Sequence, residues 1–398
     1  MIPDPVSLTG TWTYPTRMLF GPGRIAGLAE ACRELGMTKP LLVTDPGLAG
    51  LPMVRDALDA NRAAGLPTGL FSEVKPNPVG RNVEDGLSAY REGGHDGIIG
   101  FGGGSGLDAA KAVALMAGQS RPIWDFEDVG DNWTRADPAG IAPIVAVPTT
   151  AGTGSEVGRA SVILNEETHT KKVIFHPKML PAIVISDPEL TVGLPSHVTA
   201  ATGMDALAHC LEAYSAPGYH PMAEGIAVEG MRLVKDWLPV ATQNGDDVYA
   251  RGCMLAAASM GATAFQKGLG AIHALSHPVG AVYDTHHGLT NAVVMPYVLA
   301  FNRPVIEAKI TRLSAWLGLP DPSFESFMAW VLALREVLAI DNDLASLGVE
   351  TSRTEELAAM AAEDPTAGSN PTPLTPGNLA PLMQACIAGD LEAAGRIA

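Results

Sequence analysis

The chain has 398 residues, of which 43 are acidic and 26 are basic, so its formal net charge is −17. Apolar residues make up 47% of the sequence and charged residues 17%, a balance that is typical of globular proteins and excludes intrinsic disorder. The negative charge argues against nucleic acid and anionic membranes as partners, because their phosphates would be repelled. A chain of this length rarely folds around one core, so we expect two domains.

The composition of a few segments also indicates a compartment. Residues 1–5 lack a basic stretch followed by an apolar run, so we read no secretory signal in them. No stretch of 18 or more uncharged apolar residues occurs, so we expect no membrane-spanning helix. The cysteines are far apart and form no CxxC pair, which favours free thiols in the cytoplasm over disulfides or a zinc finger. They are Cys32, Cys210, Cys253 and Cys386.

The first half of the chain alternates short apolar runs with helical patterns. We predict strands at residues 40–44, 97–100, 141–147 and 182–185. The predicted helices lie around residues 54–58, 82–92 and 107–116. Strands that alternate with helices in this way are typical of a parallel sheet whose two faces are covered.

The character of the sequence changes at about residue 195. Long segments rich in Ala, Leu and Met follow, and they predict helices at residues 200–214, 222–237 and 253–265, with no convincing strand between them. Residues 364–376 are rich in Pro and Thr and are expected to form a loop before a last helix. We therefore predict an α/β N-terminal domain over residues 1–190 and an all-α C-terminal domain over residues 191–398.

A glycine cluster follows the predicted strand at residues 97–100. The cluster is Gly102-Gly103-Gly104-Ser105, and a predicted helix comes directly after it. Glycine lets the backbone approach a phosphate closely, and a helix N-terminus offers free N–H groups with positive partial charge. The spacing differs from the GxGxxG fingerprint, because Ser105 occupies the place of the third glycine. Phosphate binding and a merely tight turn are both consistent with this loop.

A second loop with many hydroxyl groups follows the next predicted strand. It contains Thr149, Thr150, Thr153 and Ser155, and by itself it is also consistent with a helix-capping turn. However, the two loops follow the carboxyl ends of neighbouring predicted strands, where open α/β sheets bind ligands. The pair therefore favours a bound cofactor.

Asp45 lies just beyond the end of the first predicted strand. A carboxylate at this place accepts hydrogen bonds from the ribose hydroxyls of NAD and repels the 2′-phosphate of NADP. We therefore predict NAD as the cofactor. The alternative is that Asp45 only starts the turn Asp45-Pro46-Gly47.

Histidines recur at helical spacing in the second half. Asp205 and His209 stand at i and i+4, and so do His273 and His277, while His287 opens another apolar helix. A carboxylate and several imidazoles on helix faces suit a divalent metal such as Fe(II) or Zn(II). A lone histidine in an apolar helix is more often a hydrogen-bonded core residue. Several such polar groups in apolar helices nevertheless favour a metal site.

These motifs resemble those of the iron-containing (group III) alcohol dehydrogenase family, and the resemblance runs nearly end to end. It rests on Gly102-Gly103-Gly104-Ser105-x-x-Asp108-x-x-Lys111, on residues 148–156, on residues 201–209, and on His273, His277 and His287-Gly288. The resemblance implies a dehydroquinate synthase-like architecture. In it, an N-terminal nucleotide-binding domain and a helical C-terminal domain hold a metal in the cleft between them.

The resemblance also implies roles for individual residues. The four implied metal ligands are Asp205, His209, His273 and His287, and His277 is implied as a proton relay. The implied cofactor-binding residues are Asp45, Asn77, Gly102, Gly103, Gly104, Ser105, Asp108, Thr149, Thr150, Thr153 and Lys171. Two positions depart from the family pattern, because His286 replaces a proline and Lys172 replaces a methionine.

The implied activity is an NAD-dependent alcohol dehydrogenase or aldehyde reductase that acts on a small neutral alcohol and contains Fe(II), with Zn(II) as the competing metal. The resemblance also suggests a homodimer formed through residues 11–20. The competing activities are a hydroxyacid–oxoacid transhydrogenase, a maleylacetate-type reductase, and a lyase or cyclase of the dehydroquinate synthase type. These use anionic substrates, which the acidic chain and its few basic residues near the predicted site disfavour.

Overall fold

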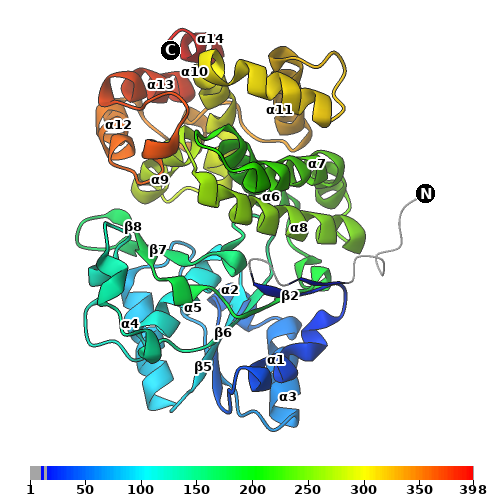
Figure 1. Cartoon of the computed structure of the whole chain (residues 1–398), viewed down its shortest axis with the longest axis vertical. Coiled ribbons are helices and arrows are strands. Elements are labelled where there is room, and N and C mark those ends of the chain that lie inside the picture. Colours follow the sequence, from blue (N-terminus) through cyan, green and yellow to red (C-terminus); the bar gives the residue numbers. More distant parts are fainter. Residues whose placement is uncertain (1–9, 13–15, 398) are drawn as a thin grey trace. The chain divides into compact units, whose positions relative to one another are not determined.

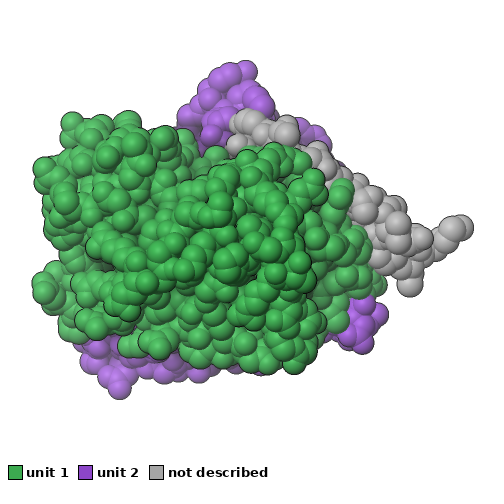
Figure 2. All heavy atoms as spheres, turned by 90° about the horizontal axis from the view of Figure 1, so that it is seen from below, with its two compact units in different colours: residues 1–193, 247–255 green, residues 194–246, 256–398 purple. Residues whose placement is uncertain are grey.

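The structure is a computed structural model that describes residues 10–12 and 16–397 (Figure 1). The chain divides into two compact units, coloured separately in Figure 2. The first contains residues up to 193 together with 247–255, and the second contains residues 194–246 and 256–398. A division into domains at residues 190 and 191 stays a prediction. Residues 1–5, in which we read no secretory signal, lie outside the described residues.

The first unit contains a seven-stranded sheet in the order β1-β2-β9-β6-β5-β3-β4. Strand β1 is antiparallel to β2, and all other neighbours in this sheet are parallel. Its strands are β1 (Gly10–Trp12), β2 (Arg17–Phe20), β3 (Pro40–Val43), β4 (Gly69–Phe71), β5 (Gly97–Gly102), β6 (Ile144–Pro148) and β9 (Ile183–Ser186).

The direction of the chain through this sheet reverses between β3 and β5. From β3 the chain passes outward to the edge strand β4, returns across β3 to β5, and continues away through β6 to β9. Ligands of open α/β sheets bind at the carboxyl ends of the two strands that flank such a reversal. The residues that follow β3 and β5 are therefore the first place to search for a cofactor site.

Helices cover both faces of the sheet (Figure 1). Helices α1 and α3 contribute to one buried core, and α4 and α5 contribute to another. The strands β3, β5, β6 and β9 consist almost entirely of buried residues, as parallel strands with two covered faces require. The helices of this unit are α1 (Leu28–Glu34), α2 (Pro46–Ala49), α3 (Pro52–Ala63), α4 (Gly80–Glu92) and α5 (Gly104–Met116).

A separate hairpin of β7 (Ala160–Asn165) and β8 (Thr170–Phe175) packs beside α5. Asp108 on α5 accepts a hydrogen bond from the backbone N–H of Val162 (2.8 Å), which fixes the hairpin to the helix. The hairpin thereby carries Lys171 to the side of the sheet where α5 begins.

The second unit is helical, and the described part of it contains no strand. Its helices are α6 (Ser196–Ser215), α7 (Pro221–Gln243), α9 (Ala271–Tyr283), α10 (His287–Trp316), α11 (Phe324–Val337), α12 (Thr354–Ala362), α13 (Pro376–Ala388) and α14 (Leu391–Gly395). Helix α8 (Val248–Ala264) begins in the first unit and ends in the second. The predicted fold class, an α/β part followed by an all-α part, is confirmed.

Helix α6 is the buried centre of the helical unit. Every residue from 199 to 214 is buried, because α7 and α10 pack closely around it. Small residues make this approach possible: a Cβ on Gly203 would lie 2.2 Å from Leu238 Cδ1. A polar side chain on α6 is consequently surrounded by protein and must find its partner there. Among the described helices none is both long enough and apolar enough to cross a bilayer.

Candidate functional site

Asp45 and Gly102 lie at the reversal point of the sheet. Asp45 directly precedes α2, and its Oδ1 accepts hydrogen bonds from the backbone N–H groups of Gly47 (2.9 Å) and Leu48 (3.1 Å). Its Oδ2 faces the glycine cluster, since a Cβ on Gly102 would lie 3.8 Å from it. Asp45 therefore does start the turn, while its second oxygen is directed to the place where a nucleotide is expected.

The glycine cluster and the hydroxyl-rich loop pack directly against one another. The backbone N–H of Thr149 donates to the carbonyl oxygen of Gly102 (3.0 Å). A Cβ on Gly104 would lie only 2.5 Å from Thr153 Cγ2, and a Cβ on Gly103 would lie 3.2 Å from Thr150. Glycine is therefore required at residue 104 by close packing. Because α5 begins at Gly104, its free N–H groups are presented at this surface.

Asn77 and Lys171 join the same surface from two other loops. Lys171 Nζ donates to Asn77 Oδ1 (3.1 Å), and Ser105 Oγ donates to the carbonyl oxygen of Pro76. Lys172 makes a different contact, since its Nζ lies 2.9 Å from Glu127 Oε1. Consecutive residues of a strand point to opposite faces, so only one of the two lysines reaches Asn77.

Asp108 has three protein partners in this structure. Its Oδ1 accepts from Ser155 Oγ (2.5 Å) and lies 3.2 Å from Lys111 Nζ, and its Oδ2 accepts from the N–H of Val162. Lys111 is almost fully buried and also donates to the carbonyl oxygen of Ser155 (3.0 Å). Asp108 thus connects α5 to the hydroxyl-rich loop and to the β7–β8 hairpin, and its contribution to cofactor binding stays a prediction.

The four predicted metal ligands come together in the helical unit. Asp205 and His209 project from α6, His273 from α9 and His287 from the first residue of α10. The Asp205 Oδ1 atom lies 3.8 Å from His209 Nε2, 3.8 Å from His273 Nε2 and 3.6 Å from His287 Nε2. Three of them, Asp205, His273 and His287, offer ligand atoms that lie within 4.8 Å of one another. The ring of His209 stacks on that of His273, with centroids 4.8 Å apart.

Gly288 explains how His287 reaches this group. A Cβ at residue 288 would lie 2.3 Å from the carbonyl oxygen of Ala201 and 3.1 Å from the Cβ of Asp205. Only glycine therefore lets the start of α10 pack so closely on α6. The neighbouring His286 serves as the N-cap of α10, where its Nδ1 accepts from the N–H of Leu289 (3.4 Å), and burial lowers its pKa.

Asn291 provides a test of whether these residues suit a cation. Its Nδ2 donates to Asp205 Oδ1 (2.7 Å) and lies 3.2 Å from His273 Nε2 and 3.1 Å from His287 Nε2. An amide nitrogen carries only two hydrogens, yet three acceptor atoms surround it. Asn291 is fully buried, and its Oδ1 has no hydrogen-bond partner among the described residues. Converging lone pairs of nitrogen and oxygen fit a divalent metal of the Fe(II) or Zn(II) type.

His273 is held from behind by a carboxylate. Its Nδ1 is hydrogen-bonded to Glu212 Oε2, and both side chains are buried. Burial disfavours the charged form of the imidazole, but the negative charge of Glu212 outweighs this effect, so the pKa of His273 is raised.

His277 lies one turn beyond His273 and has a carboxylate partner of its own. Its Nδ1 is hydrogen-bonded to Asp364 Oδ2 (2.8 Å), and its ring stacks on that of His287 with centroids 5.3 Å apart. Burial raises the pKa of Asp364, but the contact with His277 and hydrogen bonds from Thr366 outweigh this, so the pKa of Asp364 is lowered. The ring of His277 also lies near that of His273, with centroids 5.7 Å apart, so His277 is a neighbour of two predicted ligands.

Comparison with protein-family models gives two matches that together cover most of the chain. Residues 15–188 match the family described as "Iron-containing alcohol dehydrogenase", and residues 199–387 match "Fe-containing alcohol dehydrogenase family, C-terminal". The chain belongs to the iron-containing alcohol dehydrogenase family. It is therefore an oxidoreductase of the alcohol dehydrogenase class.

Individual members of this family match the chain over nearly all of its length. The 4-hydroxybutyrate dehydrogenase of Cupriavidus necator is 38% identical over 369 residues, which cover 90% of this chain and 94% of the relative. The NAD-dependent methanol dehydrogenase of Bacillus methanolicus is 34% identical and covers 93% of this chain and 98% of its own. A solved 1,3-propanediol oxidoreductase has a TM-score of 0.89 at 36% identity and covers 93% of this chain and 97% of its own.

In this iron-containing alcohol dehydrogenase family member, sequence reasoning missed three residues of the metal region. Glu212 stands seven residues after Asp205, and Asn291 stands four residues after His287, so helical spacing could have found both. Asp364 is 87 residues from His277 and lies in a segment that we expected to be a loop, so no local signal indicates it.

Proposed function

We propose that the chain is an NAD-dependent, metal-dependent dehydrogenase that interconverts a small alcohol and its aldehyde. One observation carries this proposal: a single carboxylate oxygen, Asp205 Oδ1, lies 3.6–3.8 Å from the Nε2 atoms of three histidines. A bound divalent cation there supplies Lewis acidity toward the alcohol oxygen, and NAD supplies the hydride acceptor.

Four side chains of the helical unit would hold the cation: Asp205, His209, His273 and His287. The Asp205 carboxylate offsets one of its two positive charges, so that a net positive charge remains to act on the substrate oxygen. We propose Fe(II) as the resident metal and Zn(II) as its competitor, since imidazole and carboxylate ligands accept both.

The NAD-binding residues are proposed from the surface at the reversal point of the sheet. The loop Gly102–Ser105 and the start of α5 offer N–H groups to the pyrophosphate, and Thr149, Thr150 and Thr153 extend this surface with hydroxyl groups. Asp45 faces the loop with its Oδ2 and would accept from a ribose hydroxyl. Asn77 and Lys171 are held together beside the loop, and Asp108 fixes the start of α5.

His277 is proposed to move the proton of the alcohol. Because Asp364 accepts a hydrogen bond at Nδ1, the proton of the neutral ring stays on Nδ1 and Nε2 keeps a free lone pair. Nε2 is then the atom that accepts the proton during oxidation and returns it during reduction.

For the substrate we propose a small neutral alcohol or aldehyde. The chain is strongly acidic, and the buried Lys267 of the helical unit is already engaged by Glu224 (2.8 Å) and by the carbonyl oxygen of Ala216 (2.7 Å). The 4-hydroxybutyrate dehydrogenase of Cupriavidus necator is 38% identical to this chain, and this favours a terminal hydroxy acid as the second candidate. Diols are an intermediate case, because they are neutral and carry a second polar end.

We further propose a cytoplasmic homodimer. Among the described residues, strand β1 lies at the edge of the sheet and pairs with β2, and an edge strand of this kind can pair with a strand of a second copy. Part of the segment expected to form this contact, residues 13–15, lies outside the described residues.

The test combines metal analysis of the purified protein with an assay of NADH absorbance. The panel contains methanol, longer primary alcohols, 1,3-propanediol and 4-hydroxybutyrate, each with NAD, and the matching aldehydes with NADH. We expect turnover with neutral alcohols that is lost when the metal is removed and recovered when Fe(II) or Zn(II) is added. Full activity of a metal-free protein would contradict the proposal, and a clear preference for 4-hydroxybutyrate would establish the second candidate.

A further inference from the structure

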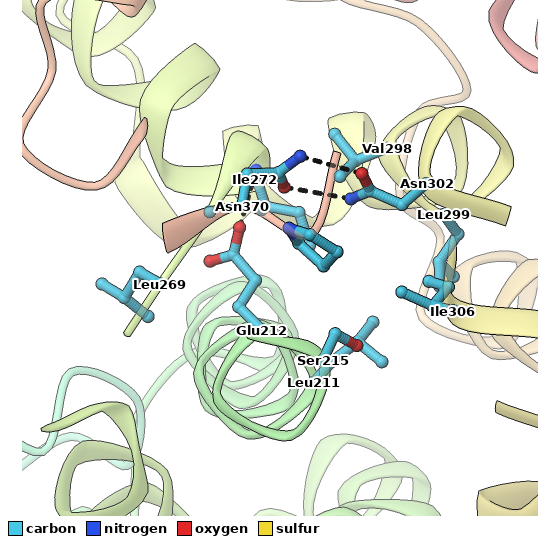
Figure 3. Close-up of a pocket in the computed structure, with 12 residues that line it drawn as sticks. Leu211, Glu212, Ser215, Leu269, Ile272, Val298, Leu299, Asn302, Ile306 and Asn370 are labelled. Atoms are coloured by element: carbon cyan, nitrogen blue, oxygen red, sulfur yellow. Dashed lines mark hydrogen bonds between the residues drawn. The ribbon is translucent and has the colours of Figure 1, made fainter. Parts of the chain in front are cut away.

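The N-terminus of α9 is fixed by side chains from two other parts of the helical unit (Figure 3). Asn370 Oδ1 accepts from the backbone N–H of Ala271 (3.0 Å), and Glu212 Oε1 accepts from the backbone N–H of Ile272 (2.7 Å). Asn370 is itself held by a reciprocal pair of hydrogen bonds with Asn302 (3.0 and 2.8 Å). The first free N–H groups of this helix are thus satisfied by two rigid acceptors.

Glu212 uses its second oxygen for the ring of His273. Its Oε2 is hydrogen-bonded to His273 Nδ1, while the carboxylate as a whole is 5% exposed. The adjoining cavity, with Glu212, Asn302 and Asn370 in its lining, has a volume of about 10 Å³. A cavity this small is no substrate site.

We infer that Glu212 is the positioning residue that makes His273 a metal ligand. An ionised carboxylate only accepts hydrogen bonds, so its contact with Nδ1 places the ring proton there and leaves the lone pair on Nε2. That Nε2 lies 3.8 Å from Asp205 Oδ1, on the side of the other predicted ligands. Since Oε1 is bound to the start of the same helix, the carboxylate fixes the backbone and the ring of His273 together. The inference rests on the proposed function, because it presupposes the metal.

The substitution Glu212→Gln tests this with little change in volume. The amide has one acceptor and one donor end, so it cannot accept from both the Ile272 N–H and His273 Nδ1. If it keeps the helix contact, its NH₂ group faces Nδ1 and drives the ring proton to Nε2, where the metal is expected. We expect Zn(II) and Co(II) to bind about 10–100-fold more weakly in a chelator competition. The ligand-field spectrum of the Co(II)-saturated protein should also shift, and NAD binding should not change.

The matched control is Glu224→Gln in the same helical unit. Glu224 contacts Lys267 and Lys309 at 2.8 and 2.7 Å and no predicted ligand. The Glu224→Gln variant should have the same affinity for Zn(II) and the same Co(II) spectrum as the wild type. A second variant, Gly270→Ala, displaces the carboxylate without removing its charge, since the new Cβ would lie 3.2 Å from Glu212 Oε1 and 2.7 Å from Asn370 Oδ1. We expect it to weaken Zn(II) binding as well.

The outcomes separate this inference from the proposed function. If the wild type binds Zn(II) and turns over but Glu212→Gln binds it equally well, the inference is overturned and the proposed function stands. An equal loss in Glu212→Gln and Glu224→Gln would likewise overturn it, because the effect would then be one of general stability. If the wild type itself binds neither Zn(II) nor Co(II), the proposed function fails first.

Discussion

The two predicted binding regions of the chain are built from different parts of the polypeptide. In the first unit the cofactor surface consists of backbone at the start of α5 and of loops packed against it, and glycine at residue 104 is required by the contact with Thr153. In the helical unit the metal region consists of side chains, Asp205 and three histidines, on three separate helices. One region therefore depends on the absence of a Cβ, and the other on the identity of each side chain.

This difference determines how each region can be damaged. A backbone surface loses its ligand when added atoms displace it, whereas removal of one neighbouring side chain leaves its N–H groups in place. A cluster of ligands loses its ion when one member is removed, because the remaining ligands cannot complete the coordination. Substitutions matched to the two regions should accordingly separate cofactor binding from metal binding.

The largest effect is expected for Asp205→Ala and His273→Ala. Both should abolish metal content and lower turnover on the order of 10³-fold or more, because the Lewis acid contributes several kcal/mol. NAD binding, measured by fluorescence titration, should survive in both. His220→Ala is the matched control, since His220 caps α7 by accepting a hydrogen bond from the N–H of Ala223 (3.3 Å). The His220→Ala protein should retain its metal. A His273→Ala protein with normal metal content and normal turnover would refute the metal assignment.

Gly104→Ala should weaken NAD binding and leave the metal in place, the converse of the result expected for the metal-ligand variants. The added methyl group would lie 2.5 Å from Thr153 Cγ2, and relief of such an overlap costs about 1–3 kcal/mol. If the displaced loop no longer fits the pyrophosphate, the Kd for NAD should rise roughly 10–100-fold. Metal content should remain that of the wild type.

The control for this loop is Gly50→Ala. A Cβ there would meet nothing within 4 Å, so NAD binding should be unaffected although the substitution is in the same unit. Equal NAD affinities for the wild type and Gly104→Ala would remove the glycine cluster from the cofactor site.

A smaller effect is expected at Asp45, where charge and capping can be separated. Asn caps a helix about as well as Asp, so Asp45→Asn should keep the bonds to Gly47 and Leu48 and lose only the negative charge. Both Asp45→Asn and Asp45→Gly should then let NADP compete, with a shift of roughly tenfold in the ratio of kcat/KM for NADP and NAD. An unchanged ratio in both variants would show that Asp45 serves only the turn.

Long apolar runs made most of the fold predictable from the sequence. The strands around residues 97–100 and 182–185 were predicted within a few residues. The three helices predicted at residues 200–214, 222–237 and 253–265 correspond to α6, α7 and α8, which extend up to six residues farther at one end. The strand predicted at 141–147 begins only at Ile144, because Pro143 cannot donate to the sheet. Strand β4 was not predicted, since it has three residues, of which only Phe71 is buried. Such a short strand is specified by its neighbour β3 and leaves little periodicity of its own.

The candidate site likewise contains residues that local sequence patterns predict and residues that they do not. The pairs Asp205/His209 and His273/His277 follow from helical spacing, and Gly288 follows from the resemblance. Asn370 and Asp364 belong to a segment whose composition predicts only a loop, and their partners Ala271 and His277 are 99 and 87 residues away. Contacts over such separations are decided by how α9 and α12 pack, which no local pattern encodes.

The smallest predicted effect concerns the free energy of unfolding rather than binding. It arises from one ion-pair cluster of the helical unit and depends on pH. Burial raises the pKa of Glu224, but hydrogen bonds and charges of Lys267 and Lys309 outweigh this, so its pKa is lowered from 4.5. A lowered pKa means that the stabilisation is complete above pH 4.5 and is lost as the pH falls through the folded value. At pH 7, Glu224→Gln should cost roughly 1.5–3 kcal/mol in urea unfolding.

As the pH falls through the lowered pKa of Glu224, the wild-type side chain itself becomes neutral, so the difference between the two proteins should shrink toward zero. Glu325→Gln is the control for a surface pair: its carboxylate contacts Arg303 but is 64% exposed, so its effect should be smaller at every pH. A difference between the wild type and Glu224→Gln that stayed constant over the whole acidic range in which the protein remains folded would show that the two lysines do not stabilise the charged form. The side chain would then contribute by its shape alone, through packing between α7 and α10.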